Sequence, residues 1–151
     1  MADVEGHAWL EELSQEECLT LLRGTDLGRI AFMAGDFPVV LPVNYRFADG
    51  SEGEWWLGLR TRPGSVIDDA PVEVAFEIDG VDSIGHRGWS VLVRGKLHHV
   101  DPAPGTSGVV DSEPWLDADR DSWLLMEPVL VTGRRLHPGP TAWAFHMRAY
   151  L

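Results

Sequence analysis

The chain has 151 residues, enough for one domain that buries roughly 70% of its unfolded surface and too few for a second full domain. Its formal net charge of −12 opposes nonspecific binding to nucleic acids and anionic membranes, and no apolar run approaches the ~18 residues of a membrane-spanning helix. The opening segment MADVEGHAWLEEL lacks the features of a secretory signal, so we expect a cytoplasmic protein. Cys18 is the single cysteine and has no partner at zinc-ligand spacing, so neither a disulfide nor a metal site is predicted.

The first predicted element is a helix within LSQEECLTLLRG, residues 13–24. Ser14 followed three residues later by Glu17 is typical of a capping box at a helix start. The apolar residues from Cys18 to Leu22 fall at helical spacing, and Gly24 is expected to end the helix.

After Gly24 the apolar period changes from helical spacing to two, which is typical of half-buried strands. In PVVLPVNYRF, for example, the apolar positions alternate with Asn44 and Arg46. Segments rich in Gly, Pro, Asp and Ser separate the strands. The predicted strands are residues 28–33, 38–47, 54–61, 72–79, 89–100 and 127–136. Six short strands with no helices alternating between them favour a mainly β, closed antiparallel barrel.

The remaining segments are less regular. Residues 101–114 are predicted to form a loop and residues 115–126 a short helix. The C-terminal tail, residues 137–151, opens with a Pro-Gly-Pro break and carries Trp143, Phe145 and Tyr150. Exposed aromatic side chains are unusual at a free chain end, so we expect a partner subunit to cover this tail.

Taken in order, the segments ECLTLL, GRIAF, PVVLPVNY, RTRPGS, VAFEID, GWSVLVRG and VTGRRL resemble the FMN-binding split-barrel family related to pyridoxamine 5′-phosphate oxidase, in its actinobacterial form. The resemblance implies a single domain over residues 1–151, with a barrel core at about 13–136 and the tail at 137–151. It also implies a six-stranded antiparallel split β-barrel with an N-terminal helix and short peripheral helices. Such proteins are homodimers that hold two FMN cofactors in clefts between the subunits.

The resemblance also assigns cofactor-binding residues. The strand beside the flavin ring corresponds to Pro42, Val43, Asn44 and Tyr45. The turn that holds the phosphate corresponds to Arg60, Thr61 and Ser65, and further contributions are expected from Trp89, Ser90 and Arg134. The residue types suit these roles, because an amide offers both donors and acceptors, and RTRPGS supplies guanidinium, hydroxyl and backbone N–H groups for a phosphate.

The sequence departs from the family pattern directly after this turn. Where relatives often carry a lysine, this chain has Val66, followed within three residues by Asp68 and Asp69. The missing positive charge is expected to weaken the phosphate site.

The implied function is that of a flavin-dependent oxidoreductase acting on a small molecule that the sequence does not name, since the flavin itself carries the electrons. The alternatives are a flavin-binding or storage module without turnover, and a relative that uses a deazaflavin. No catalytic residue is predicted. Haem is disfavoured because His98 and His99 alternate faces and cannot bind one metal together from a regular strand. Glu73, Glu77 and Asp79 are interpreted as a solvated strand face.

Overall fold

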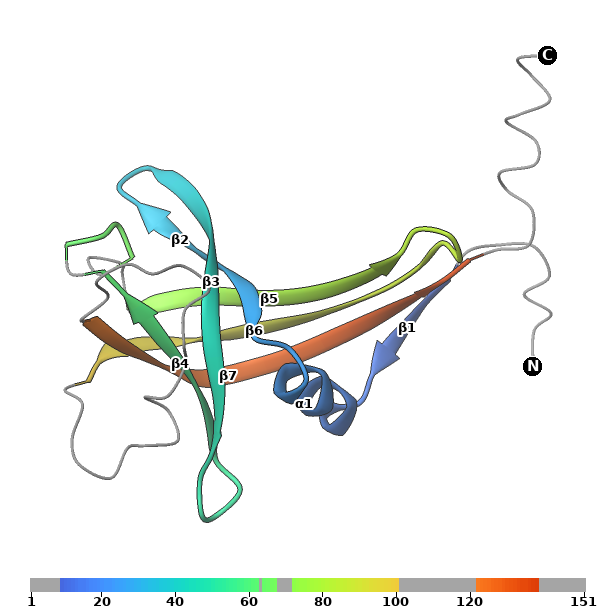
Figure 1. Cartoon of the computed structure of the whole chain (residues 1–151), viewed down its shortest axis with the longest axis horizontal. Helices are drawn as coiled ribbons and strands as arrows, with labels where there is room; N and C mark the ends of the chain where they lie inside the picture. Colours follow the sequence, from blue (N-terminus) through green and yellow to red (C-terminus); the bar gives the residue numbers. More distant parts are fainter. Residues whose placement is uncertain (1–8, 63, 68–71, 101–121, 139–151) are drawn as a thin grey trace.

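The computed structural model describes residues 9–62, 64–67, 72–100 and 122–138. Within these ranges the chain forms one helix and seven strands (Figure 1). In order they are β1 (Trp9–Leu13), α1 (Gln15–Arg23), β2 (Leu27–Ala34), β3 (Phe37–Asp49), β4 (Trp55–Thr61), β5 (Glu73–Asp82), β6 (Arg87–His99) and β7 (Ser122–His137).

Six of the strands close into an antiparallel ring. The order is β7, β4, β3, β2, β5 and β6, and β6 pairs again with β7. β1 is a seventh strand that pairs with the far end of β7, from Leu13 opposite Gly133 to Trp9 opposite His137. The predicted mainly β barrel with an N-terminal helix is therefore confirmed, with one strand more than expected.

The ring is split along one edge of β7. On that edge β4 pairs with residues 122–126 and β1 pairs with residues 133–137, while β6 occupies the opposite edge. Helix α1 packs beside this opening and contacts β7, β3 and β6 (Figure 1). The helix thus covers the stretch of β7 that lies between its two partners on this edge.

Helix α1 begins with the predicted capping box. The Glu17 backbone N–H donates to Ser14 Oγ at 3.2 Å, and the Ser14 N–H donates to the Glu17 carboxylate at 2.8 Å. These two bonds satisfy backbone donors that a helix start otherwise leaves open. The helix ends at Gly24, whose N–H donates to the carbonyls of Thr20 and Leu21.

The core fills the inside of the ring with the residues that the period of two predicts. Opposite residues in an antiparallel pair share a face, so one alternating set points inward on every strand. Its fully buried members include Ile30, Leu57, Leu59, Phe76, Ile78, Val91, Val93, Leu124 and Met126. The other set points outward.

One expectation was wrong: residues 122–126, expected to end a short helix, form the first part of β7. In addition, the sequence analysis did not foresee β1. Residues 101–121 and the tail from residue 139 lie outside the described ranges, as do the predictions made for them. In the described ranges α1 is the only helix, and with nine residues it is too short to cross a bilayer.

Candidate functional site

The predicted cofactor residues divide between the two faces of the sheet. Val43, Tyr45, Thr61 and Trp89 share the inward set with the core residues. The outward set holds the remaining strand residues of the prediction: Pro42, Asn44, Arg60, Ser90 and Arg134. A molecule lying on the outer face therefore meets only the second group in one subunit.

Tyr45 is a core residue. Its side chain is 2% exposed, and its ring meets that of Phe76 edge to face with centroids 4.8 Å apart. The hydroxyl donates to the Leu22 carbonyl at 2.7 Å, and burial raises the pKa of this phenol. The ring thus anchors the end of α1 to the barrel, and only the backbone of Tyr45 is left for a cofactor.

Tyr45→Phe is expected to lower the free energy of unfolding by about 1 kcal/mol, because the Leu22 carbonyl loses its buried donor. The melting temperature should fall by about 2–4 °C. Flavin affinity should not change, since the hydroxyl points into the core. Chemical denaturation and flavin titration of the same variant measure both quantities, and a loss of flavin binding with unchanged stability would contradict this role.

The turn after β4 carries two buried hydroxyl groups. Thr61 is 5% exposed, and neither Thr61 Oγ1 nor Ser65 Oγ has a hydrogen-bond partner among the described residues. The turn is closed by the Ser65 N–H, which donates to the Arg62 carbonyl at 3.1 Å. A buried polar group without a partner is unfavourable by about 1–3 kcal/mol, so an anionic acceptor bound here would relieve both hydroxyls. These two residues fit the predicted phosphate contacts.

The Arg60 side chain points away from the face on which Thr61 lies. Its guanidinium carbon lies 5.4 Å from the centroid of the Trp123 ring, and both residues belong to the outward set. Val66, directly after Ser65, is 55% exposed. The turn therefore offers the two buried hydroxyl groups and leaves the Val66 position open to solvent.

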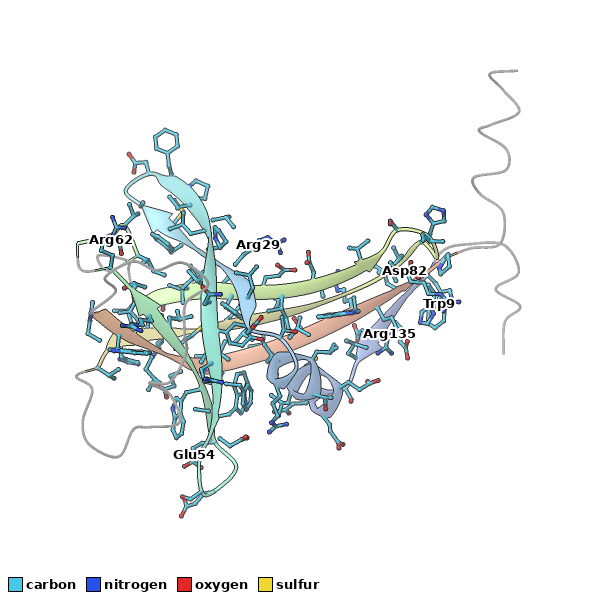
Figure 2. All side chains as sticks on the ribbon, in the orientation of Figure 1. Trp9, Arg29, Glu54, Arg62, Asp82 and Arg135 are labelled. Carbon is cyan, nitrogen blue, oxygen red and sulfur yellow. The ribbon has the colours of Figure 1, made fainter. Side chains whose placement is uncertain are left out.

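Within one subunit, Ser90 and Arg134 lie far from this turn. Thr61 pairs with Ser122, whereas Ser90 pairs with Arg134, twelve residues further along β7. Twelve residues of a straight, extended strand span about 40 Å. Figure 2 shows the same separation, with Arg62 near one end of the molecule and Arg135 near the other.

Sequence reasoning missed Arg29 on the outer face. Arg29 is paired with Pro42 on one side and Glu77 on the other, and its Nη1 lies 3.0 Å from Glu77 and 3.3 Å from Asp79. Burial, followed by the charge of Asp79, raises the pKa of Glu77. Two of the three carboxylates interpreted as a solvated face, Glu77 and Asp79, are thus partly neutralised by a guanidinium beside the predicted flavin strand.

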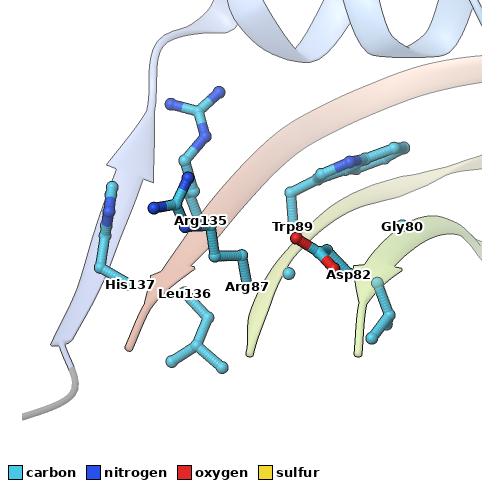
Figure 3. Close-up of a pocket in the computed structure, with 9 residues that line it drawn as sticks. Gly80, Asp82, Arg87, Trp89, Arg135, Leu136 and His137 are labelled. Atoms are coloured by element: carbon cyan, nitrogen blue, oxygen red, sulfur yellow. The ribbon is translucent and has the colours of Figure 1, made fainter. Parts of the chain in front are cut away.

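A pocket of about 520 Å³ opens at the far end of β5, β6 and β7, and its lining includes Asp82, Arg87, Trp89, Arg135 and His137 (Figure 3). We call it the tip pocket. Of these residues the sequence prediction included only Trp89. The others come from the three strands β5, β6 and β7, and only the strand register brings them together.

The closed antiparallel ring, split beside a helix, defines a split-barrel protein. The family model of pyridoxamine 5′-phosphate oxidase matches residues 14–135. The chain therefore belongs to the pyridoxamine 5′-phosphate oxidase family.

Individual relatives agree with this assignment. The protein Rv0080 of Mycobacterium tuberculosis is 34% identical over 133 residues, covering 83% of this chain and 84% of that protein. The FAD binding protein from Mycobacterium smegmatis is 30% identical with a TM-score of 0.65, over 83% of this chain and 98% of that one. An FAD-binding protein from Mesorhizobium loti shares the fold, with a TM-score of 0.70 at 22% identity, over 86% and 98% of the two chains.

Proposed function

We propose that this protein binds a flavin, with FMN as the expected form, and that its phosphate accepts hydrogen bonds from Thr61 and Ser65. The observation that carries the proposal is the pair of buried hydroxyls without partners at this turn. The relatives from M. smegmatis and M. loti, described as FAD-binding, support a flavin in the same family. Pro42 and Asn44 point outward on the adjoining strand and would border the ring, together with the backbones of Val43 and Tyr45.

We further propose that the active form is a homodimer joined through the outer face of the sheet. A continuous row of outward residues crosses five strands: Val40, Ala31, Ala75, Arg94 and Leu130. Val40 is 61% and Leu130 47% exposed, which is unfavourable for a face left in water. A second copy on this face would cover these side chains and bring its own Ser90 and Arg134 toward the flavin.

A bound flavin supplies hydride and electron transfer, so the proposed activity is oxidation or reduction of a small molecule. The chain itself would bind and orient the flavin and shield it from water. The alternatives are flavin binding without turnover and use of a deazaflavin. Titration with FMN, FAD and a deazaflavin separates the cofactors, and stopped-flow reoxidation of the reduced protein separates an enzyme from a carrier.

Thr61→Val is expected to change stability and flavin affinity in opposite directions. Valine keeps the shape and removes a buried hydroxyl without a partner, so the protein without flavin should be as stable as the wild type or more stable by about 1 kcal/mol. FMN affinity should fall about tenfold, because the phosphate loses a hydrogen bond of about 1.5 kcal/mol. Denaturant melts and FMN titrations measure the two effects.

Riboflavin and Ser83→Ala are the controls for this prediction. Riboflavin has the same ring and no phosphate, so its affinity for Thr61→Val should equal that for the wild type. Ser83 is an exposed serine in the β5–β6 hairpin, and its replacement should leave FMN affinity unchanged. A variant that loses stability and still binds FMN normally would place the phosphate elsewhere.

Sedimentation of the wild type at micromolar concentration should show a dimer. Val40→Glu and Leu130→Glu should shift the protein to a monomer and weaken FMN binding, because each replaces an exposed apolar side chain of the proposed interface with a charge. Ile84→Glu is the control, since Ile84 is also apolar and, at 93%, even more exposed, but lies in the β5–β6 hairpin. A monomeric wild type that binds flavin stoichiometrically would contradict the two-chain site.

A further inference from the structure

The tip pocket lies on the inward face of the sheet, beyond the end of α1. Two rows of side chains cross this face. Gly80, Trp89, Arg135 and Glu11 follow one another across β5, β6, β7 and β1 in the first row. In the second row Asp82 pairs with Arg87 across β5 and β6, and His137 pairs with Trp9 across β7 and β1.

Trp89 gives the tip pocket an aromatic surface. Gly80 has no side chain, and a β-carbon at this position would come within 2.5 Å of the Trp89 indole. The indole is therefore packed against the Gly80 backbone, and Figure 3 shows it at the side of the pocket. The His137 ring forms the opposite side and stacks on Trp9, with centroids 4.1 Å apart. A flat ligand would find aromatic rings on both sides.

Most of the charged groups around the tip pocket already have partners. Arg135 lies 3.4 Å from Glu11 and 3.5 Å from Glu17. His137 Nε2 lies 2.7 Å from the Glu11 carboxylate, and this contact lowers the pKa of Glu11. Asp82 accepts from the backbone N–H groups of Ile84 and Gly85 within its own hairpin.

Arg87 lies beside a carboxylate that is already engaged. It stands opposite Asp82 across β5 and β6, and its charge contributes to the lowered pKa of Asp82, whose Oδ1 accepts from two backbone N–H groups. The Arg87 guanidinium brings its five N–H donors to the rim of the aromatic pocket. Guanidinium groups bind carboxylates and phosphates through pairs of parallel hydrogen bonds.

We infer that the tip pocket is a second ligand site, which takes a small planar aromatic molecule carrying one carboxylate or phosphate group. The ring would lie between Trp89 and His137, and the anionic group would meet Arg87. This site is separate from the proposed flavin site of the same subunit, because Trp89 and Arg135 point to the face opposite Ser90 and Arg134. The inference therefore stands whether or not the protein binds flavin.

Calorimetric titration of the full chain with 2-naphthoate tests the inference. The wild type should bind one molecule per chain, and Arg87→Gln should weaken binding about tenfold or more. Gly80→Ala should weaken it similarly without removing a polar group, because the new methyl displaces the indole. Lys96→Gln removes one positive charge from the outward face of the same strand and should leave binding unchanged.

Two ligand controls separate the ring from the charge. Naphthalene-2-methanol keeps the rings and lacks the charge, and cyclohexanecarboxylate keeps the charge and lacks the aromatic ring; each should bind about tenfold more weakly than 2-naphthoate. Absence of 2-naphthoate binding at millimolar concentration, or equal binding to wild type and Arg87→Gln, would overturn the inference. Displacement of 2-naphthoate by FMN would overturn the separation of the two sites, whereas unchanged affinity in saturating FMN supports it.

Discussion

Val66→Lys is expected to tighten FMN binding about ten- to a hundredfold. Val66 is exposed and follows Ser65, one of the two hydroxyls proposed to hold the phosphate. A lysine ammonium that reaches the phosphate forms a charge-assisted hydrogen bond of about 1.5–3 kcal/mol, which corresponds to this gain in affinity. Fluorescence titration with FMN measures the change.

Two controls show whether the gain comes from a phosphate contact. Riboflavin affinity should stay the same, because riboflavin offers no anion to the new ammonium. Val81→Lys adds the same charge at another exposed valine, which lies near the far end of β5, and should affect FMN little. If riboflavin gains as much as FMN, the assignment of Thr61 and Ser65 to the phosphate is wrong.

Gly133→Ala is expected to lower the free energy of unfolding by about 2–3 kcal/mol. Gly133 lies in β7 where α1 and the end of β1 pack against it. A β-carbon there would stand 2.5 Å from Cys18 Sγ and 3.1 Å from the Leu13 side chain. Both neighbours are buried, so the helix has to move away from the sheet.

A double mutant tests this explanation directly. Cys18→Ala removes the nearest atom, so Gly133→Ala combined with Cys18→Ala should lose less stability than the two single changes added together. Thr132→Val alters the neighbouring exposed residue and should change stability by less than about 0.5 kcal/mol. Additive effects in the double mutant would show that the methyl group meets something other than the cysteine.

The ring strands were predictable because each buries one alternating set of apolar residues. β1 was not predictable, because its inward positions mix apolar and charged residues. Glu11 points inward, where β7 presents Arg135 and His137 as partners, so the segment resembles an acidic surface until the pairing is known. The start of β7 was mistaken for a helix because Trp123, Leu124 and Leu125 form a continuous apolar run, and such a run has no period.

The candidate site was also predictable only in part, because strand pairing decides which side chains meet. The family resemblance assigned the phosphate to RTRPGS, and the proposed phosphate contact depends on the buried hydroxyls of Thr61 and Ser65 in this turn. Arg60 belongs to the same turn, yet strand alternation sends its guanidinium to Trp123 on the other face. The tip pocket could not be predicted from the sequence, because it depends on which residues of β5, β6 and β7 stand opposite each other.

The late position of β7 in the chain has a consequence for biosynthesis. β7 pairs with β1, β4 and β6, so the ring cannot close until its residues have left the ribosome. At about 5–20 residues per second, the chain between the end of β6 at His99 and the end of β7 at His137 takes several seconds to translate. During that interval β4 and β6 of the nascent chain present unpaired backbone edges to the cell. Ribosome stalling before Ser122 should therefore favour aggregation or chaperone binding, whereas release after His137 should allow the barrel to close.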